Sequence, residues 1–141
     1  MRDRVVSNET LTLNSRDIQR LEPLLARHES STAPAHLRVL TDKLALCAEA
    51  APSSVPSDVV TMNSRVRLQD LESNAESEYE LVFPNEADSG AGRISVLAPL
   101  GAALIGARIG EVVEVPTPRG TRRLLVRALL FQPEAAGRYD L

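Results

Sequence analysis

The chain is 141 residues long, carries a formal net charge of −3 at pH 7, and is 43% hydrophobic but only 3% aromatic. This length predicts one domain, or one domain with a small appendage, and its core must be built from Leu, Val, Ile and Ala. Proteins that bind duplex DNA normally have a basic surface and a basic pI, so the acidic balance argues against sequence-specific DNA binding. The single cysteine, Cys47, excludes an intrachain disulfide.

No stretch of the sequence approaches the ~20 consecutive apolar residues that a membrane-spanning helix needs. The first residues, MRDRVVSNETL, lack the apolar core of a signal peptide. We therefore expect a soluble cytoplasmic protein that has no membrane partner.

The N-terminal part of the chain begins with a helical pattern. A short strand is expected at 10–13, and apolar residues then recur every three or four positions, which predicts a helix near 15–28. Asn14 or Ser15 is positioned to cap this helix. Pro23 lies inside it and has no backbone donor, so we expect either a kink or a helix that begins only just before the proline.

A second helix is predicted near 34–50, opened by a proline that follows a turn. Its apolar positions have a heptad-like spacing, which suits an antiparallel coiled coil with the first helix. These positions are Leu37, Leu40, Leu44 and Cys47. Cys47 is therefore expected to be a small core residue. The Pro- and Ser-rich run 51–57 ends this helical hairpin and is the expected linker.

From residue 58 the hydrophobic period falls to two, which is typical of β-strands. The alternation predicts strands at 62–69, 78–83, 112–116 and 123–130, and the sequence TPRG between the last two predicts a turn. Antiparallel strands with one short helix define an α+β domain.

The short helix is predicted in the segment that follows the second of these strands. An acidic, Gly-rich loop at 86–92 leads into a β-branched run at 93–97, and a helical turn then covers 100–105. Pro99 opens this turn and Gly106 closes it, as expected for a helix. So short a helix is not stable alone in water, so it must lie against the neighbouring strands.

Few residues are candidates for chemistry. His28 and His36 lie eight residues apart, which does not match the spacing of zinc ligands on one helix. The acidic residues between Asp70 and Glu80 have two interpretations: a metal site or docking patch, or a solvated β-hairpin. Calcium-binding loops place their oxygen ligands at fixed spacings, which these residues do not have, so the hairpin is favoured. No set of residues has a catalytic pattern. We therefore expect neither an enzyme nor a bound metal or cofactor.

Three stretches carry a resemblance to a known family. The sequence NEADSGAGRISVLAPLGAALIG, followed by EVVEVP, resembles the C-terminal domain of the Gre transcript-cleavage factors. SDVVTMNSRVRL at 57–68 and FQPEAAGRYDL at 131–141 are similar to the regulator of nucleoside diphosphate kinase (Rnk), a short relative of Gre. The resemblance implies an FKBP-like fold, in which a curved sheet cups a short helix. The resemblance covers the chain from about residue 58, so the expected parts are a helical hairpin at 1–50, a linker at 51–57 and a Gre-type domain at 58–141.

The resemblance also implies RNA polymerase as the partner. In Gre factors this domain grips the rim of the polymerase secondary channel through the loop and helix start that carry the motif. The matching positions here are Asp88, Ile94, Ser95, Ala98, Pro99 and Leu100. Ala98 stands where Gre factors commonly have Ser, which would remove a hydrogen bond of roughly 0.5–1.5 kcal/mol. Ile94, Pro99 and Leu100 have an alternative interpretation as core residues, whereas a loop carboxylate such as Asp88 is expected to gain little from the fold.

Gre factors also insert a long helical hairpin whose acidic tip helps to hold the metal for transcript cleavage. Here each arm has about 14–17 residues and a length of about 20–25 Å. The turn contains one acid, Glu29, where metal capture requires paired carboxylates. We therefore expect a protein that competes with Gre factors at the secondary channel without stimulating cleavage.

Two other functions are alternatives to this one. An adaptor that binds nucleoside diphosphate kinase directly stays open, although an indirect effect through transcription is favoured. A prolyl isomerase of the FKBP type is disfavoured because its pocket is walled by aromatic side chains. This chain has only two Phe, two Tyr and no Trp.

Overall fold

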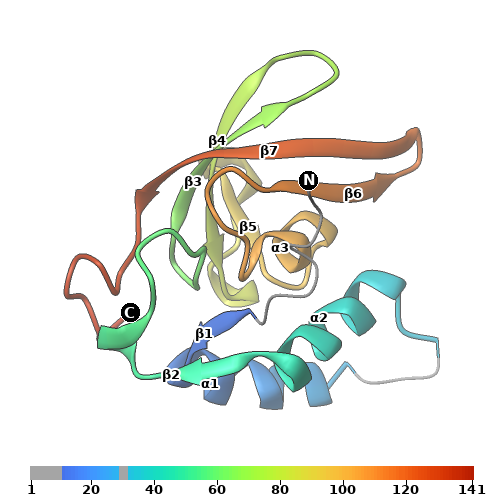
Figure 1. The fold of residues 1–141 in the computed structure, drawn as a ribbon. Helices are drawn as coiled ribbons and strands as arrows, with labels where there is room; N and C mark the ends of the chain where they lie inside the picture. The colour runs from blue at the N-terminus through green and yellow to red at the C-terminus, as the bar shows by residue number, and fades with distance from the viewer. Residues whose placement is uncertain (1–10, 29–31) are drawn as a thin grey trace.

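The structure is a computed structural model that describes residues 11–28 and 32–141. A curled five-stranded sheet surrounds the short helix α3, and the helices α1 and α2 lie together on one side of it (Figure 1). The sheet consists of β3 (Arg65–Asp70), β4 (Glu76–Val82), β5 (Arg93–Ser95), β6 (Val112–Thr117) and β7 (Gly120–Phe131). The predicted α+β class is therefore confirmed.

The strand order of the sheet is β5-β4-β3-β7-β6. β4 and β5 run parallel, and all other neighbours run antiparallel. The predicted turn at TPRG is confirmed, because Thr117 pairs with Gly120 and leaves Pro118 and Arg119 as a two-residue loop. The register of β3 against β7 shifts at two points. Such irregularities bend a strand and increase its twist, which fits the curl of the sheet.

The helix α3 (Pro99–Leu104) lies inside the curled sheet and packs against β5, β6 and α2. Proline at its first position already has the φ of a helix and needs no donor there. Gly106 follows with φ of +83°, a conformation that glycine adopts without strain. The predicted short helix is confirmed, and Ala102 and Leu104 are buried in the core.

The helices α1 (Ser15–Ala26) and α2 (Ala35–Leu46) precede the sheet in the chain. Asn14 caps α1, because its side-chain oxygen accepts from the backbone N–H groups of Arg16 at 2.7 Å and Asp17 at 3.4 Å. α1 continues through Pro23, so the alternative that it begins only just before the proline is wrong.

The predicted second helix, 34–50, is too long at its C-terminal end. Residues Ala48–Ala50 form the strand β2, which pairs in parallel with β1 (Thr12–Asn14). The backbone becomes extended at Cys47, and the N–H of Ala48 donates to the carbonyl of Leu11 at 2.6 Å. Pairing with the segment before α1 therefore ends the helix. The expected strand at 10–13 is found slightly later in the chain.

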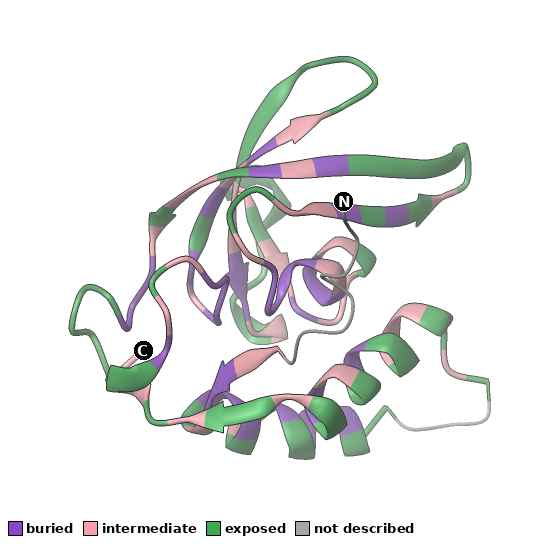
Figure 2. Ribbon diagram, viewed as in Figure 1, coloured by how far each residue is buried: buried purple, intermediate pink, exposed green. Residues whose placement is uncertain are grey.

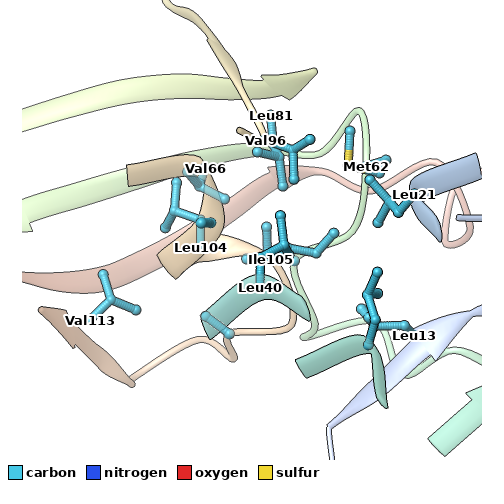
Figure 3. Packing of buried hydrophobic residues seen from close by; sticks show 14 of the residues in the cluster. Leu13, Leu21, Leu40, Met62, Val66, Leu81, Val96, Leu104, Ile105 and Val113 are labelled. Carbon is cyan, nitrogen blue, oxygen red and sulfur yellow. The ribbon is translucent and has the colours of Figure 1, made fainter. Parts of the chain in front are cut away.

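One hydrophobic core joins the helices to the sheet. Figure 3 shows side chains from all parts of the fold meeting between α1, α2, α3 and the sheet, and Figure 2 shows the buried faces of these elements. Fully buried members include Leu13, Leu21, Leu40, Met62, Leu104 and Ile105. Cys47 is half-buried against this cluster. The expected linker contains the 3₁₀-helix η2 (Pro52–Ser54); the division into 1–50, 51–57 and 58–141 stays a prediction.

The last eleven residues bind α1 to the rest of the fold. Glu134 is buried, and its carboxylate accepts from the Asn14 amide at 2.6 Å and from the Thr61 hydroxyl at 2.7 Å. Arg16 donates to the carbonyls of Tyr139 at 2.7 Å and Asp140 at 3.0 Å. The FQPEAAGRYDL sequence is thus a structural element that spans α1 and the segment before β3.

Candidate partner-binding site

The candidate site begins with a tight loop. Asp88 and Arg93 exchange two backbone hydrogen bonds of 2.9 Å, which close the loop at its base. The Asp88 carboxylate accepts from the backbone N–H of Gly90 at 3.1 Å and so caps the 3₁₀-helix η4 (Ser89–Ala91). Asp88 therefore supports the local fold, contrary to the expectation that a loop carboxylate gains little from it.

The turn from β5 into α3 is fixed by two hydrogen bonds to Ser95. The hydroxyl oxygen of Ser95 accepts from the N–H of Leu97 at 3.0 Å, and the carbonyl of Ser95 accepts from the N–H of Ala98, also at 3.0 Å. A Cβ on Gly101 would lie only 2.1 Å from the carbonyl oxygen of Ser95. The first turn of α3 can therefore lie against β5 only because residue 101 has no side chain.

Ala98 is the N-cap residue of α3. Its backbone is extended, with φ of −74° and ψ of 156°, and among the described residues no side chain caps this helix. Serine at an N-cap position accepts from a free N–H group of the first turn. The alanine therefore removes a hydrogen bond within the fold itself, which is separate from any contact with a partner.

The predicted site residues lie on the loop before β5, on β5 itself, which is an edge strand of the sheet, and at the start of α3. Asp88 and Pro99 are exposed, and the other four are half-buried: Ile94, Ser95, Ala98 and Leu100. The exposed residues supply one carboxylate and one proline ring, and the half-buried ones include the apolar side chains of Ile94 and Leu100. Partner binding by these residues stays a prediction. Glu29, the expected tip acid, lies outside the described residues.

Two residues of α2 support the site and were not identified from the sequence. The Nε2–H of His36 donates to the carbonyl of Leu97 at 3.0 Å, just before α3 begins. The ammonium of Lys43 donates to the carbonyls of Ala102, Ala103 and Ile105 at 2.8–3.1 Å, where α3 ends. Burial lowers the pKa of Lys43 from 10.5 to about 8, although the charge of Glu111 opposes this shift.

A buried carboxylate anchors α1 below this site. Oδ2 of Asp17 accepts from the backbone N–H of Met62 at 3.0 Å, and Oδ1 accepts from Arg20 at 2.5 Å. Burial raises the pKa of Asp17 to about 6, against the opposing effect of these two hydrogen bonds. The Arg20 guanidinium also lies over the ring of Phe83, 4.7 Å from its centre. These contacts fix α1 against the start of the loop that carries Asp88.

The acidic residues of the first hairpin are exposed or half-buried, and four of the five pair with arginine within the described residues. Glu78 receives a hydrogen bond of 2.9 Å from Arg67, and Arg122 pairs with Asp70 at 3.2 Å. Backbone donors, chiefly the N–H of Glu72, lower the pKa of Asp70. This agrees with the interpretation as a solvated hairpin.

Within the described parts of the chain, no group of three or more His, Cys, Asp or Glu residues is arranged to hold a metal ion. Within those same parts, no helix combines the length and apolar character needed to cross a membrane.

Comparison with known proteins identifies the family. Residues 55–129 match the family model of the C-terminal domain of the transcription elongation factors GreA and GreB. The chain therefore belongs to the GreA/GreB family. It is 36% identical over 139 residues to the regulator of nucleoside diphosphate kinase of Escherichia coli (strain K12), and the match covers 96% of this chain and 100% of that protein.

Two further relatives agree with this assignment. The transcription elongation factor GreA of Chlorobium phaeobacteroides is 42% identical over 96 residues, which are 67% of this chain and 60% of that protein. A solved structure of a GreA/GreB elongation factor from Nitrosomonas europaea superposes with a TM-score of 0.74 at 33% identity. That superposition covers 88% of this chain and 100% of the other.

Proposed function

We propose that this protein is a transcription regulator that binds RNA polymerase at the secondary channel and competes with Gre factors without stimulating transcript cleavage. The observation that carries the proposal is that the residues matched by the family model include the candidate partner-binding site. The family match at 55–129 includes the whole segment from Asp88 to Leu100, which has a defined loop, strand and helix start. The protein would act by binding, in the cytoplasm, without enzymatic activity or a cofactor.

The helices support the absence of cleavage stimulation. α1 and α2 have 12 residues each, which corresponds to about 18 Å of helix. α2 also packs against α3, so part of this length lies beside the domain rather than beyond it. We infer a short antiparallel hairpin, a coiled coil with arms of about three turns each, that occupies the channel entrance. The domain from residue 58 would then be FKBP-like in its curved sheet and enclosed helix.

A direct effect on nucleoside diphosphate kinase is the second candidate. The observation that favours it is the name of the E. coli relative, which matches this chain over its full length. Pull-down from a lysate with the tagged protein separates the two functions. Recovery of polymerase without the kinase supports the first proposal, and recovery of the kinase in the absence of polymerase supports the second. A prolyl isomerase stays the least favoured alternative.

Binding to core RNA polymerase should depend on the charge of Asp88. The Asp88→Asn change keeps the oxygen that caps η4 but removes the charge, so the loop should stay folded while the affinity falls. Glu72→Gln is the matched control, because Glu72 is an exposed acid on another turn. Pro99→Ala tests the helix start in the same titration. If neither Asp88→Asn nor Pro99→Ala weakens binding while circular dichroism shows an intact fold, this interface is wrong.

A further inference from the structure

A groove lies between α1 and the segment that leads into the candidate site. Its volume is about 450 Å³, which is within the usual range of ligand pockets. One wall is formed by Arg20 and Leu24 of α1 and by its C-cap residue Arg27. The other is formed by residues 83–86, which include the 3₁₀-helix η3 (Pro84–Glu86). Asp88 follows two residues later. The groove and the candidate partner-binding site are therefore contiguous in the chain.

The two arginines in the groove differ in how many partners their guanidinium groups already have. Arg20 is held in place by Asp17 and by the ring of Phe83, and one of its nitrogens also donates to the carbonyl of Leu141 at 3.1 Å. Its Nε–H is buried, and no described group accepts from it. Arg27 is exposed, and its guanidinium has no carboxylate partner among the described residues. Among the described residues, the groove thus has one guanidinium that is held by its contacts and one that has no carboxylate partner.

The charge of the groove limits what can bind there. Asp17 compensates Arg20, and Glu86 at the rim opposes Arg27, so the groove offers little net positive charge. A nucleotide would bring two or more negative phosphate charges, which this arrangement does not balance. A single carboxylate needs only one guanidinium that is not already paired, and Arg27 has no carboxylate partner among the described residues. The apolar surface of Leu24, Phe83 and Pro84 suits an apolar side chain beside that carboxylate.

We propose that this groove is a second contact site for RNA polymerase and receives a segment of the polymerase in which an acidic side chain lies next to an apolar one. Arg27 binds the carboxylate, and Leu24 and Phe83 contact the apolar side chain. The inference rests on the proposed function. It adds a contact on α1 to the one formed by the loop and α3, so that the helices and the sheet domain bind the partner together.

The test compares Arg27→Gln with Arg119→Gln in a titration of core RNA polymerase. Both changes remove one exposed arginine charge, and Arg119 lies in the two-residue turn between β6 and β7. Arg27→Gln should weaken binding about tenfold, the equivalent of about 1.4 kcal/mol, and Arg119→Gln by less than twofold. Equal effects of the two changes, or none, would overturn the inference. If Asp88→Asn still weakens binding in that case, the proposed function stands without the groove, whereas absence of binding by the wild-type protein refutes both.

A crosslink identifies the occupant. Asn85 lies on the wall of the groove and is exposed, so p-benzoylphenylalanine at this position should crosslink to whatever binds there. In the complex with core polymerase, mass spectrometry should find a polymerase peptide with Asp or Glu beside an apolar residue. A crosslink to nucleic acid or to a basic peptide would contradict the proposal, as would competition by inorganic tripolyphosphate.

Discussion

At the scale of single residues, α3 begins with an alanine that cannot cap it. Ala98 has the extended backbone of an N-cap residue, and only its side chain lacks an acceptor. We expect Ala98→Ser to raise the free energy of unfolding by about 1 kcal/mol, because the hydroxyl can accept from a free N–H group of the first turn. Urea unfolding measures the change, and Ala98→Val is the control that adds size without an acceptor. Equal stabilisation by both variants would show that packing, not capping, is responsible.

Asp17 makes a second prediction at this scale, which concerns pH. Its pKa is about 6 in the folded protein and 3.8 in the reference state, so the folded state favours the protonated carboxyl. This contribution to stability is fully present below pH 3.8 and is lost as the pH rises through 6. With ~1.36 kcal/mol per pKa unit, the loss is about 3 kcal/mol.

The comparison with Asp17→Asn isolates this effect. The variant cannot titrate at residue 17, so the stability of the wild type relative to the variant should fall between pH 4 and pH 7. Urea unfolding of both proteins at four pH values in this range measures the difference. A difference that is constant or rises with pH would show that the hydrogen bonds from Met62 and Arg20 outweigh burial.

At the scale of elements, α3 depends on a side chain from another helix. Lys43 binds three carbonyls where α3 ends, and those carbonyls would be left without this donor in Lys43→Met. The cost of unpaired buried polar groups is about 1–3 kcal/mol. We therefore expect that loss of unfolding free energy, together with faster hydrogen exchange at the Ile105 amide. Arg38→Met is the matched control, since Arg38 is exposed on the same helix. A loss of the same size in both variants would contradict the role of Lys43.

The elements that were predictable from the sequence are those with local causes. Alternation defines β3, β4, β6 and β7, the TPRG turn joins two of them, and Pro99 with Gly106 marks the limits of α3. The contacts that fix the site are not local, because His36 and Lys43 bind groups 59 to 62 residues away in the chain. The end of α2 was mispredicted for the same reason, since pairing with β1 overrides its helical pattern. A single sequence shows which residue types occupy the candidate site, but it does not show which distant residues hold them in place.

At the scale of the whole molecule, the short helices predict the outcome of a transcript-cleavage assay. Catalytic metal chemistry tolerates displacement of the metal ligands by little more than ~1 Å. Helices of about 18 Å do not provide the reach, and Glu29, the single acid in the turn, does not provide the paired ligands. We expect backtracked transcripts to stay uncut with this protein alone. In excess, it should slow their cleavage by a Gre factor, and Asp88→Asn should weaken that inhibition. Transcript shortening by this protein alone, abolished by Glu29→Ala, would show that the turn is catalytic.

The parallel pairing of β1 and β2 has a consequence for how the length of the helical hairpin can vary during evolution. Parallel neighbours must be joined by a crossover, and here that crossover consists of α1, its following turn and α2. The pair fixes the points where the crossover leaves and returns, whatever its length. Seven residues added to each helix would extend it by about 10.5 Å while the loop and α3 kept their positions. Insertions near the turn would therefore lengthen the helices, and with them the proposed reach into RNA polymerase, without moving the loop and α3 of the candidate site.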